Sequence, residues 1–270
     1  MSILLCIGGE QIRIVASPGV IAAVSGRYRP FVTSRTRTSP RRIPIVLEIR
    51  CRPGRFRAAY EQPLTIQARE TAPGEIRLDG PVAGCYSLTD RQGWLEGAPG
   101  LGAVDALLRI ALSTALPLDG ALLVHGAALR HDRDGGIVLC GASGAGKSTA
   151  ARALGAFCDE LAVLRLTKSG LHFHSTPYWR GEPVQSSCAA VICLARGGEP
   201  GFERLRGAAA ARVLSRHAVR YVTVDRIDRA VLDLLCAIGE RAGVWLASCP
   251  EGEAFIPFLK GILRFDKEVA

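Results

Sequence analysis

The residues with the clearest chemistry form one short segment, GASGAGKS, at residues 141–148. It fits the phosphate-binding pattern G-x-x-x-x-G-K-[ST], in which glycines let successive backbone N–H groups turn toward an anion. Lys147 is expected to reach the β- and γ-phosphates of ATP, and the Ser148 hydroxyl to bind the accompanying Mg²⁺. The residues expected to contact the nucleotide are Gly141, Ala142, Ser143, Gly144, Ala145, Gly146, Lys147, Ser148 and Thr149.

The segments on either side of this loop fit the same prediction. An apolar run at residues 137–141 leads into the loop, and residues 147–157 have the composition of a short helix. A helix N-terminus adds the positive end of its dipole to the site, which favours bound phosphate. The simpler alternative, a glycine turn that only precedes a helix, explains less of this strand–loop–helix pattern.

Two consecutive acids, Asp159 and Glu160, follow the loop and precede an apolar segment at residues 161–166. An acid pair this close to the phosphates could hold Mg²⁺ or accept a hydroxyl proton. No other acid ends an apolar strand in the way a Walker-B aspartate does. From spacing alone, a solvated turn between a helix and a strand is the more frequent explanation of such a pair.

His125 lies in a predicted strand at residues 120–129, which turns back into residues 137–141 as a β-hairpin. In that strand Leu123, His125 and Ala127 would share one face. The pattern leaves two explanations open. His125 is either a core histidine with satisfied hydrogen bonds or a residue that approaches the γ-phosphate.

A third group of polar residues falls in residues 175–183, STPYWRGEP. Its aromatic and charged side chains suit either the lip of a substrate site or a capped turn anchored by a tryptophan, and the sequence leaves both open. The residues concerned are Tyr178, Trp179, Arg180 and Glu182. His172 and His174 alternate on a short strand without Cys or acid at ligand spacing, so we expect no metal site there.

Taken in order, the segments LLVHGAAL, IVLCGASGAGKSTAARAL, CDELAVLRL and STPYWRGEP resemble the HPr kinase/phosphorylase-like family, which shares a core with phosphoenolpyruvate carboxykinase. The resemblance covers about residues 103–265 and is strongest to kinases found beside lasso-peptide biosynthesis genes. It implies a serine kinase that phosphorylates a peptide or protein and assembles as a homo-oligomer. It also implies that His125 lies near the transferring phosphate. Asp159 and Glu160 then match the family's acid pair, one as base and one as Mg²⁺ ligand.

The sequence departs from the family pattern in three ways. Glu160 replaces the usual second Asp, the stretch between loop and acids is short, and no arginine-bearing phosphorylase segment is recognisable. The resemblance therefore implies a kinase without the reverse activity. Two alternatives remain open: a nucleotide-binding regulatory module without transfer activity, and a kinase for a small molecule such as free serine.

The composition of the chain argues against several other classes of protein. The chain has 270 residues and a net charge of +9, but its basic residues are almost all Arg and are dispersed, and aromatics make up 6%. Nucleic-acid recognition is therefore not expected. The nine cysteines contain no CxxC pair, which indicates reduced, buried thiols of a cytoplasmic protein. The N-terminus is a poor signal peptide, and no apolar run reaches the ~18 residues of a membrane helix.

These observations predict an α/β fold in two domains. Residues 1–100 form strands and turns, a small β-rich domain that is a candidate substrate-binding region, with a basic loop at residues 27–42. Residues 101–270 form a P-loop kinase core of the HPr kinase type, whose hairpin before the loop requires a mixed sheet. In this part the helices are expected at 103–115, 207–219, 228–242 and 253–263, and further strands at 160–166, 171–176, 188–196 and 243–249.

Overall fold

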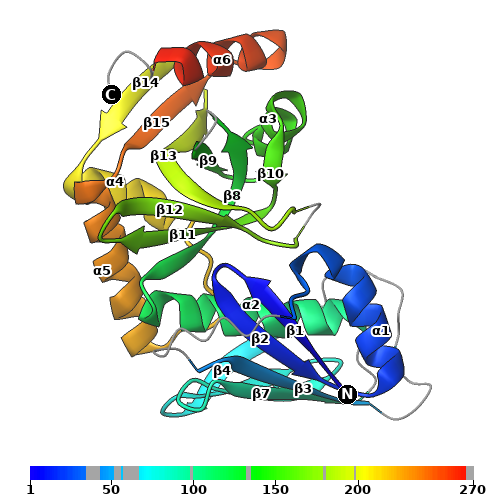
Figure 1. The fold of residues 1–270 in the computed structure, drawn as a ribbon. Helices are drawn as coiled ribbons and strands as arrows, with labels where there is room; N and C mark the ends of the chain where they lie inside the picture. Colours follow the sequence, from blue (N-terminus) through cyan, green and yellow to red (C-terminus); the bar gives the residue numbers. More distant parts are fainter. Residues whose placement is uncertain are drawn as a thin grey trace. The chain divides into compact units, whose positions relative to one another are not determined.

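The computed structural model describes residues 1–34, 43–51, 56, 67–97, 100–131, 135–178, 181–197 and 199–265. The chain divides into two compact units (Figure 1). Unit 1 comprises Met1–Asp119 and Arg220–Asp228, and unit 2 comprises Gly120–Val219 and Arg229–Ala270. Each unit contains a mixed β-sheet, so the α/β class with mixed sheets is confirmed. The division differs from a boundary near residue 100, because the helix after that point groups with unit 1.

Unit 1 is built on a seven-stranded sheet in the order β1-β2-β3-β7-β6-β5-β4. Its strands alternate between buried apolar and exposed polar residues, as expected for a sheet with one solvated face. The pairs β2–β3 and β3–β7 are parallel, and the other pairs are antiparallel. The strands are β1 (Ser2–Ile7), β2 (Glu10–Val15), β3 (Ile45–Cys51), β4 (Gln67–Ala72), β5 (Glu75–Asp79), β6 (Ala83–Ser87) and β7 (Gln92–Gly97).

Two α-helices belong to unit 1, and one of them was not predicted. Helix α1 (Pro18–Arg27) begins at a proline and buries Val20 and Val24, which lie one turn apart. The expectation of only strands and turns was wrong here, because ten residues give little periodicity. A 3₁₀ turn (Arg29–Phe31) follows it within the predicted basic loop, whose residues 35–42 lie outside the described part.

Helix α2 (Leu101–Leu118) is the central helix of unit 1 and buries every residue except Leu118. It packs against β7, and the Tyr28 hydroxyl donates to the Asp105 carboxylate on its buried surface. Among the described residues, α2 alone is long and apolar enough to cross a membrane, and 94% of it is buried in the protein. That burial is the pattern of a core helix.

Unit 2 holds an eight-stranded sheet in which β8–β11–β12–β13–β9–β8 form a closed circuit of pairings. The predicted antiparallel hairpin β8–β9 is confirmed. Strands β9, β13 and β15 are parallel, so their carboxyl ends meet at one edge. The strands are β8 (Ala121–Arg130), β9 (Gly135–Gly141), β10 (Ala156–Cys158), β11 (Leu161–Thr167), β12 (Gly170–Ser175), β13 (Gln185–Arg196), β14 (Gly201–Leu205) and β15 (Val244–Cys249).

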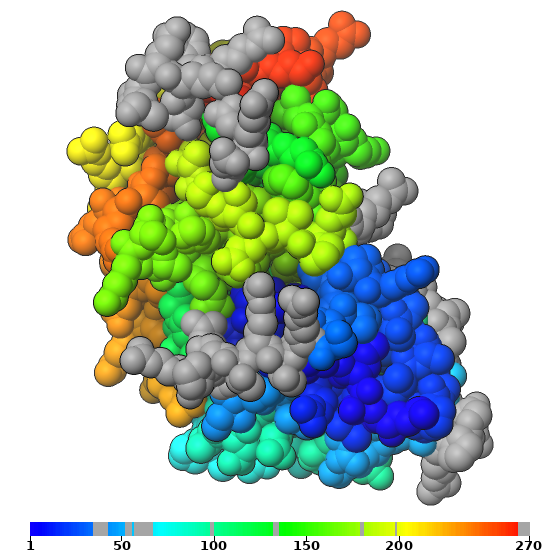
Figure 2. Space-filling view, in the orientation of Figure 1, coloured from blue at the N-terminus to red at the C-terminus, as the bar shows by residue number. Residues whose placement is uncertain are grey.

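The helices after β9 are α3 (Lys147–Leu154), α4 (Gly207–Ser215), α5 (Asp225–Arg241) and α6 (Phe255–Phe265), with a 3₁₀ turn at Gly252–Ala254. Helix α3 ends three residues before the expected Phe157, because Gly155 takes a φ of 80° and β10 follows. Helices α3 and α6 contact one another, and Figure 2 shows α6 in orange-red beside α3 in green. Leu259 of α6 belongs to one buried apolar cluster with Leu139 of β9 and Ile192 of β13.

Candidate functional site

Two strand registers bring the predicted site residues together in unit 2. In β8, Gly126 lies opposite Cys140, the residue before the phosphate-binding loop, and His125 lies opposite Leu161, the first residue of β11. The Gly126 N–H also donates to Glu160 O at 3.1 Å. His125 is therefore placed between the loop that follows β9 and the acid pair that precedes β11.

The glycine after His125 has a steric cause. A Cβ on Gly126 would lie 2.6 Å from Leu139 O and 3.3 Å from Cys140 Sγ. Only a residue without a side chain lets β8 and β9 approach this closely. The His-Gly pair thus joins a polar side chain at the site to a close backbone contact that fixes its position.

The loop itself is shaped by glycines in left-handed conformations. Gly144 has a φ of 78° and Gly146 a φ of 96°, and Gly146 forms the N-cap of α3. Between them the Ala145 N–H donates to Ala142 O at 3.1 Å. The first-turn N–H groups of a helix have no intrahelical acceptor, so this turn presents donors and a positive dipole end. The local geometry is that of an anion cradle.

Lys147 begins α3, and its side chain is only 6% exposed. Its Nζ donates to Gly141 O at 2.7 Å and to Ala142 O at 2.9 Å. Burial lowers the pKa of Lys147, and the charge of Asp159 opposes this shift. The ammonium group is thus held at the base of the loop by backbone carbonyls.

The acid pair is held in a fixed turn. Asp159 is 7% exposed, and its Oδ1 accepts a hydrogen bond from the Glu160 N–H at 2.8 Å. Glu160 has a φ of 75°, a left-handed conformation that is uncommon for a residue with a side chain. Such conformations cost about 1–3 kcal/mol and gather at functional sites. The solvated-turn explanation does not account for the burial of Asp159.

His125 is half-buried, and its pKa is lowered by desolvation and by the charge of Lys147. The imidazole is therefore neutral at neutral pH and carries one donor and one acceptor nitrogen. Its backbone N–H donates to His217 O at 2.8 Å. The explanation of His125 as an ordinary core histidine fits less well than a place at the edge of the loop.

Sequence reasoning missed His217, which follows α4. Desolvation, together with the charges of Lys147, His125 and Arg216, lowers the pKa of His217 to about 4. Val219 and Leu123 share a backbone hydrogen bond that holds residues 217–219 against β8. No sequence signal marks this contact, because it joins segments far apart in the chain.

The side chains of His125, Lys147, Asp159 and Glu160 share one pocket of about 290 Å³, whose lining does not include His217. The pocket is lined by His125, Ser143, Gly144, Lys147, Ser148, Asp159 and Glu160. The other residues predicted to contact the nucleotide lie outside this lining: Gly141, Ala142, Ala145, Gly146 and Thr149, the last of which is exposed on α3. The structure thus brings all four predicted catalytic residues to one cavity.

The predicted lip at residues 175–183 is only partly described. Tyr178 is fully buried, which fits an anchored turn better than a lip, and Trp179 and Arg180 lie outside the described residues. Glu182 pairs with Arg130 at 3.4 Å. His172 bonds Ser169 Oγ, and within the described ranges no three His, Cys, Asp or Glu side chains gather as a metal site.

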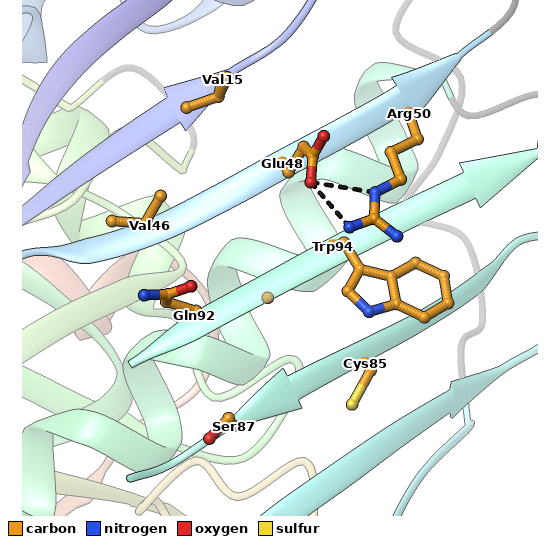
Figure 3. A pocket seen from close by; sticks show the side chains of 9 residues that line it. Val15, Val46, Glu48, Arg50, Cys85, Ser87, Gln92 and Trp94 are labelled. Atoms are coloured by element: carbon orange, nitrogen blue, oxygen red, sulfur yellow. Dashed lines mark hydrogen bonds and ion pairs between the residues drawn. The ribbon is translucent and has the colours of Figure 1, made fainter. Parts of the chain in front are cut away.

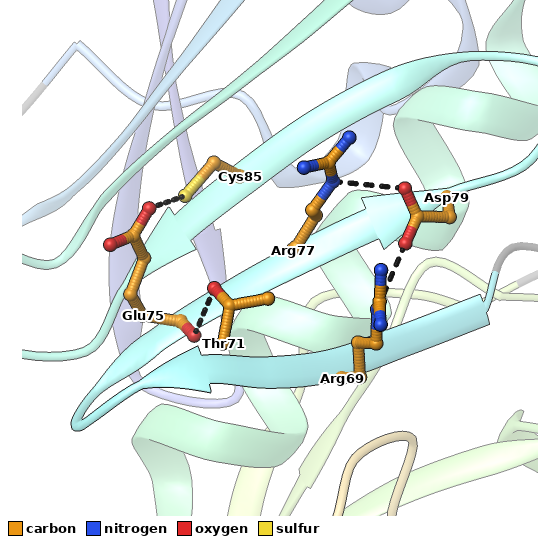
Figure 4. Close-up of polar contacts among 6 residues, drawn as sticks. All are labelled: Arg69, Thr71, Glu75, Arg77, Asp79 and Cys85. Atoms are coloured by element: carbon orange, nitrogen blue, oxygen red, sulfur yellow. Dashed lines mark hydrogen bonds and ion pairs between the residues drawn. The ribbon is translucent and has the colours of Figure 1, made fainter.

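A second hollow, of about 320 Å³, lies on the solvated face of the sheet in unit 1 (Figure 3). Its charged groups are already paired: Arg50 bonds Glu48 at 2.8 Å and stacks 5.0 Å from the centre of the Trp94 ring. Further along the same face, Arg69 and Arg77 both bind Asp79 (Figure 4). Because this face satisfies its own charges, the loop pocket of unit 2 is the better candidate site.

The sequence matches no protein-family model, and it has no significant match among curated proteins.

Proposed function

We propose that the chain is an ATP- and Mg²⁺-dependent serine kinase with an HPr-kinase-like core, which transfers the γ-phosphate to a serine hydroxyl of a peptide or protein. The observation that supports this most directly is the pocket that His125, Lys147 and Asp159 line together. Phosphoryl transfer depends chiefly on positioning and on neutralising charge. This pocket supplies a cation, a neutral imidazole and a carboxylate around one cradle.

The volume and the hydrogen-bond donors of the pocket support binding of the phosphate end of a nucleotide. Its volume of about 290 Å³ lies at the lower limit of ligand pockets, which span about 300–1,000 Å³. The left-handed turns at Gly144 and Gly146 and the start of α3 provide N–H donors for phosphate oxygens. Lys147 is anchored at the base of the same loop. The residues present therefore fit a triphosphate.

Magnesium is expected to enter with the nucleotide, where it neutralises charge on the β- and γ-phosphate oxygens. The residues that would hold it are Ser148, whose hydroxyl is at the start of α3, and one carboxylate of the pair Asp159 and Glu160. Oxygen ligands of this kind, few in number, suit Mg²⁺, which keeps several waters and binds through substrate phosphates.

Asp159 and His125 have separate roles in the transfer. The Glu160 N–H fixes Asp159 Oδ1, which leaves Oδ2 to accept the proton of the serine hydroxyl. The serine oxygen then bonds to the γ-phosphorus as the bond to the ADP oxygen breaks, and the proton stays on Asp159. His125, neutral because its pKa is lowered, donates a hydrogen bond to the transferring phosphate.

The acceptor class follows from the resemblance to kinases beside lasso-peptide genes. We propose a serine of a precursor peptide as the acceptor. A free-serine kinase and a nucleotide-responsive module without transfer are the competing proposals, and the same assay separates all three.

The test is phosphate transfer from radiolabelled ATP to serine-containing peptides and to free serine, with Mg²⁺. Lys147→Ala and Asp159→Asn are each expected to reduce transfer at least ~100-fold, because they remove the phosphate cation and the base. The matched controls are Lys168→Ala and Asp233→Asn, exposed residues of the β11–β12 turn and of α5. Both controls should retain wild-type rates.

Unchanged transfer in both Lys147→Ala and Asp159→Asn would refute the proposed site. ATP binding without any phosphorylated product would favour the regulatory module. Phosphoserine formed only from the free amino acid would identify a small-molecule kinase.

A further inference from the structure

Arg196 ends β13, the parallel neighbour of the strand that feeds the loop. In that pairing Leu194 lies opposite Gly141, the first residue of the loop. Arg196 follows two residues later and pairs with Cys249 of β15, so it lies at the carboxyl edge of the sheet, from which the loop also leaves. It was predicted only as the last residue of a buried strand, and its partner strand lies far away in the sequence.

The guanidinium of Arg196 lies directly beside the loop. A Cβ placed on Gly144 would be 3.6 Å from Arg196 Nη1 and 3.8 Å from its Cζ. The side chain is exposed, and across the described part of the chain no hydrogen bond or ion pair engages it. Gly144 lines the pocket, so an uncommitted cation adjoins its wall.

Lys147 and Arg196 stand in contrast. Lys147 is buried and donates to the carbonyls of Gly141 and Ala142. Arg196 approaches from the β13 side, and within the described ranges no residue engages its donors. A guanidinium remains charged at every physiological pH, and its planar donors match phosphate oxygens bidentately.

We infer that Arg196 is a second phosphate-contacting cation, which binds β- and γ-phosphate oxygens of the nucleotide from the side of β13. This inference rests on the proposed function, because it requires a nucleotide in the loop pocket. An arginine supplied by the same chain stabilises the charge that develops during phosphoryl transfer. A Walker-B aspartate at the end of a strand would give a carboxylate to the metal. Arg196, at the end of β13, instead contributes positive charge to the phosphates.

The experiment measures the affinity for ATP, ADP and AMP by isothermal titration calorimetry, in Mg²⁺, for the full chain and three variants. Arg196→Gln removes the charge, Arg196→Lys restores a cation without the planar fork, and Arg212→Gln is the matched control on the exposed face of α4. Arg196→Gln should weaken ATP about 10–100-fold and ADP less, and leave AMP unchanged. Arg196→Lys should recover part of the ATP affinity, and Arg212→Gln should match wild type.

The dependence on the number of phosphates distinguishes a phosphate contact from a structural effect, which would alter all three nucleotides alike. If wild type binds ATP and Arg196→Gln binds it equally well, the assignment of Arg196 is overturned while the proposed function stands. If affinities for all three nucleotides fall together, the assignment is also overturned. If the wild-type chain binds none of the nucleotides, the proposed function and the assignment both fail.

Discussion

Gly126 lies opposite Cys140 in the β8–β9 hairpin, and so close to Leu139 O that a methyl group on Gly126 would not fit. The contact aligns two strands and, through them, the histidine that precedes Gly126 with the loop that follows Cys140. The position of His125 therefore depends on a backbone contact one residue away.

Gly126→Ala is expected to destabilise the fold, because the added Cβ would lie 2.6 Å from Leu139 O. We expect a loss of about 1–3 kcal/mol in the free energy of unfolding, the usual cost of overpacking. Urea unfolding followed by circular dichroism measures it. The control is Gly261→Ala in α6, where a Cβ meets nothing within 4 Å and should be neutral or stabilising. Equal stability of the two variants would contradict the close contact.

At position 160 we expect a glycine variant to be more stable than an alanine variant, the reverse of the usual order. Glycine tolerates the φ of 75° without strain, whereas alanine does not. Glu160→Gly should therefore be more stable than Glu160→Ala by about 1 kcal/mol. Thermal unfolding of the two variants measures the difference. Because both lack the carboxylate, they should show the same reduced phosphate transfer. An alanine variant at least as stable as the glycine variant would show that the turn is not strained.

The local motifs of unit 2 were predictable because each is encoded within a few residues. The loop was predicted from residue type and spacing, and the hairpin from its turn. Spacing alone left the acid pair and His125 open, and only the resemblance to the HPr kinase/phosphorylase-like family implied a place for them in the site. Helix α3 is shorter than predicted, because Gly155 ends it and the three residues of β10 show no strong strand pattern in the sequence.

What sequence reasoning missed was carried by contacts between distant segments. Arg196 reaches the loop only through the parallel pairing of β13 with β9, and His217 reaches His125 only through the chain after α4. Helix α2 groups with unit 1 although it follows the expected boundary, because its apolar surface has no single face that indicates its partner. Each case depends on a nonlocal contact that composition does not encode.

His217 should make stability depend on pH. Its pKa is about 4 in the folded chain and 6.5 as the ordinary value, so the unfolded chain binds the proton first. Stability is therefore lost as the pH falls from about 6.5 to about 4. In His217→Gln, the free energy of unfolding should fall by roughly 1 kcal/mol less over this pH range than in wild type. This value is smaller than the pKa shift alone would give, because the side chain is only half-buried and solvent screens its charge. Urea unfolding across this pH range measures it, and parallel profiles for variant and wild type would exclude the effect.

The cysteine thiols should differ in their rate of chemical modification according to their exposure to solvent. Cys236 is exposed, whereas Cys158 and Cys188 are buried. Burial raises the pKa of Cys158 to about 11 and that of Cys188 to about 12, which suppresses the reactive thiolate. A maleimide should modify Cys236 first, and the buried pair only after unfolding, as peptide mass spectrometry can follow. Cys236→Ser should remove the fast phase, and rapid native modification of Cys188 would contradict its burial.

The order of the two units along the chain has a consequence for translation and for the design of truncated expression clones. Residues 220–228 belong to unit 1, although all of Gly120–Val219 comes before them. During translation, unit 1 cannot be completed until the ribosome has released most strands of unit 2. Deletion of the first hundred codons would leave α2 and residues 220–228 without the sheet of unit 1. It would also remove Tyr28, the hydrogen-bond partner of Asp105. An expression clone of unit 2 must therefore begin after α2, not at it.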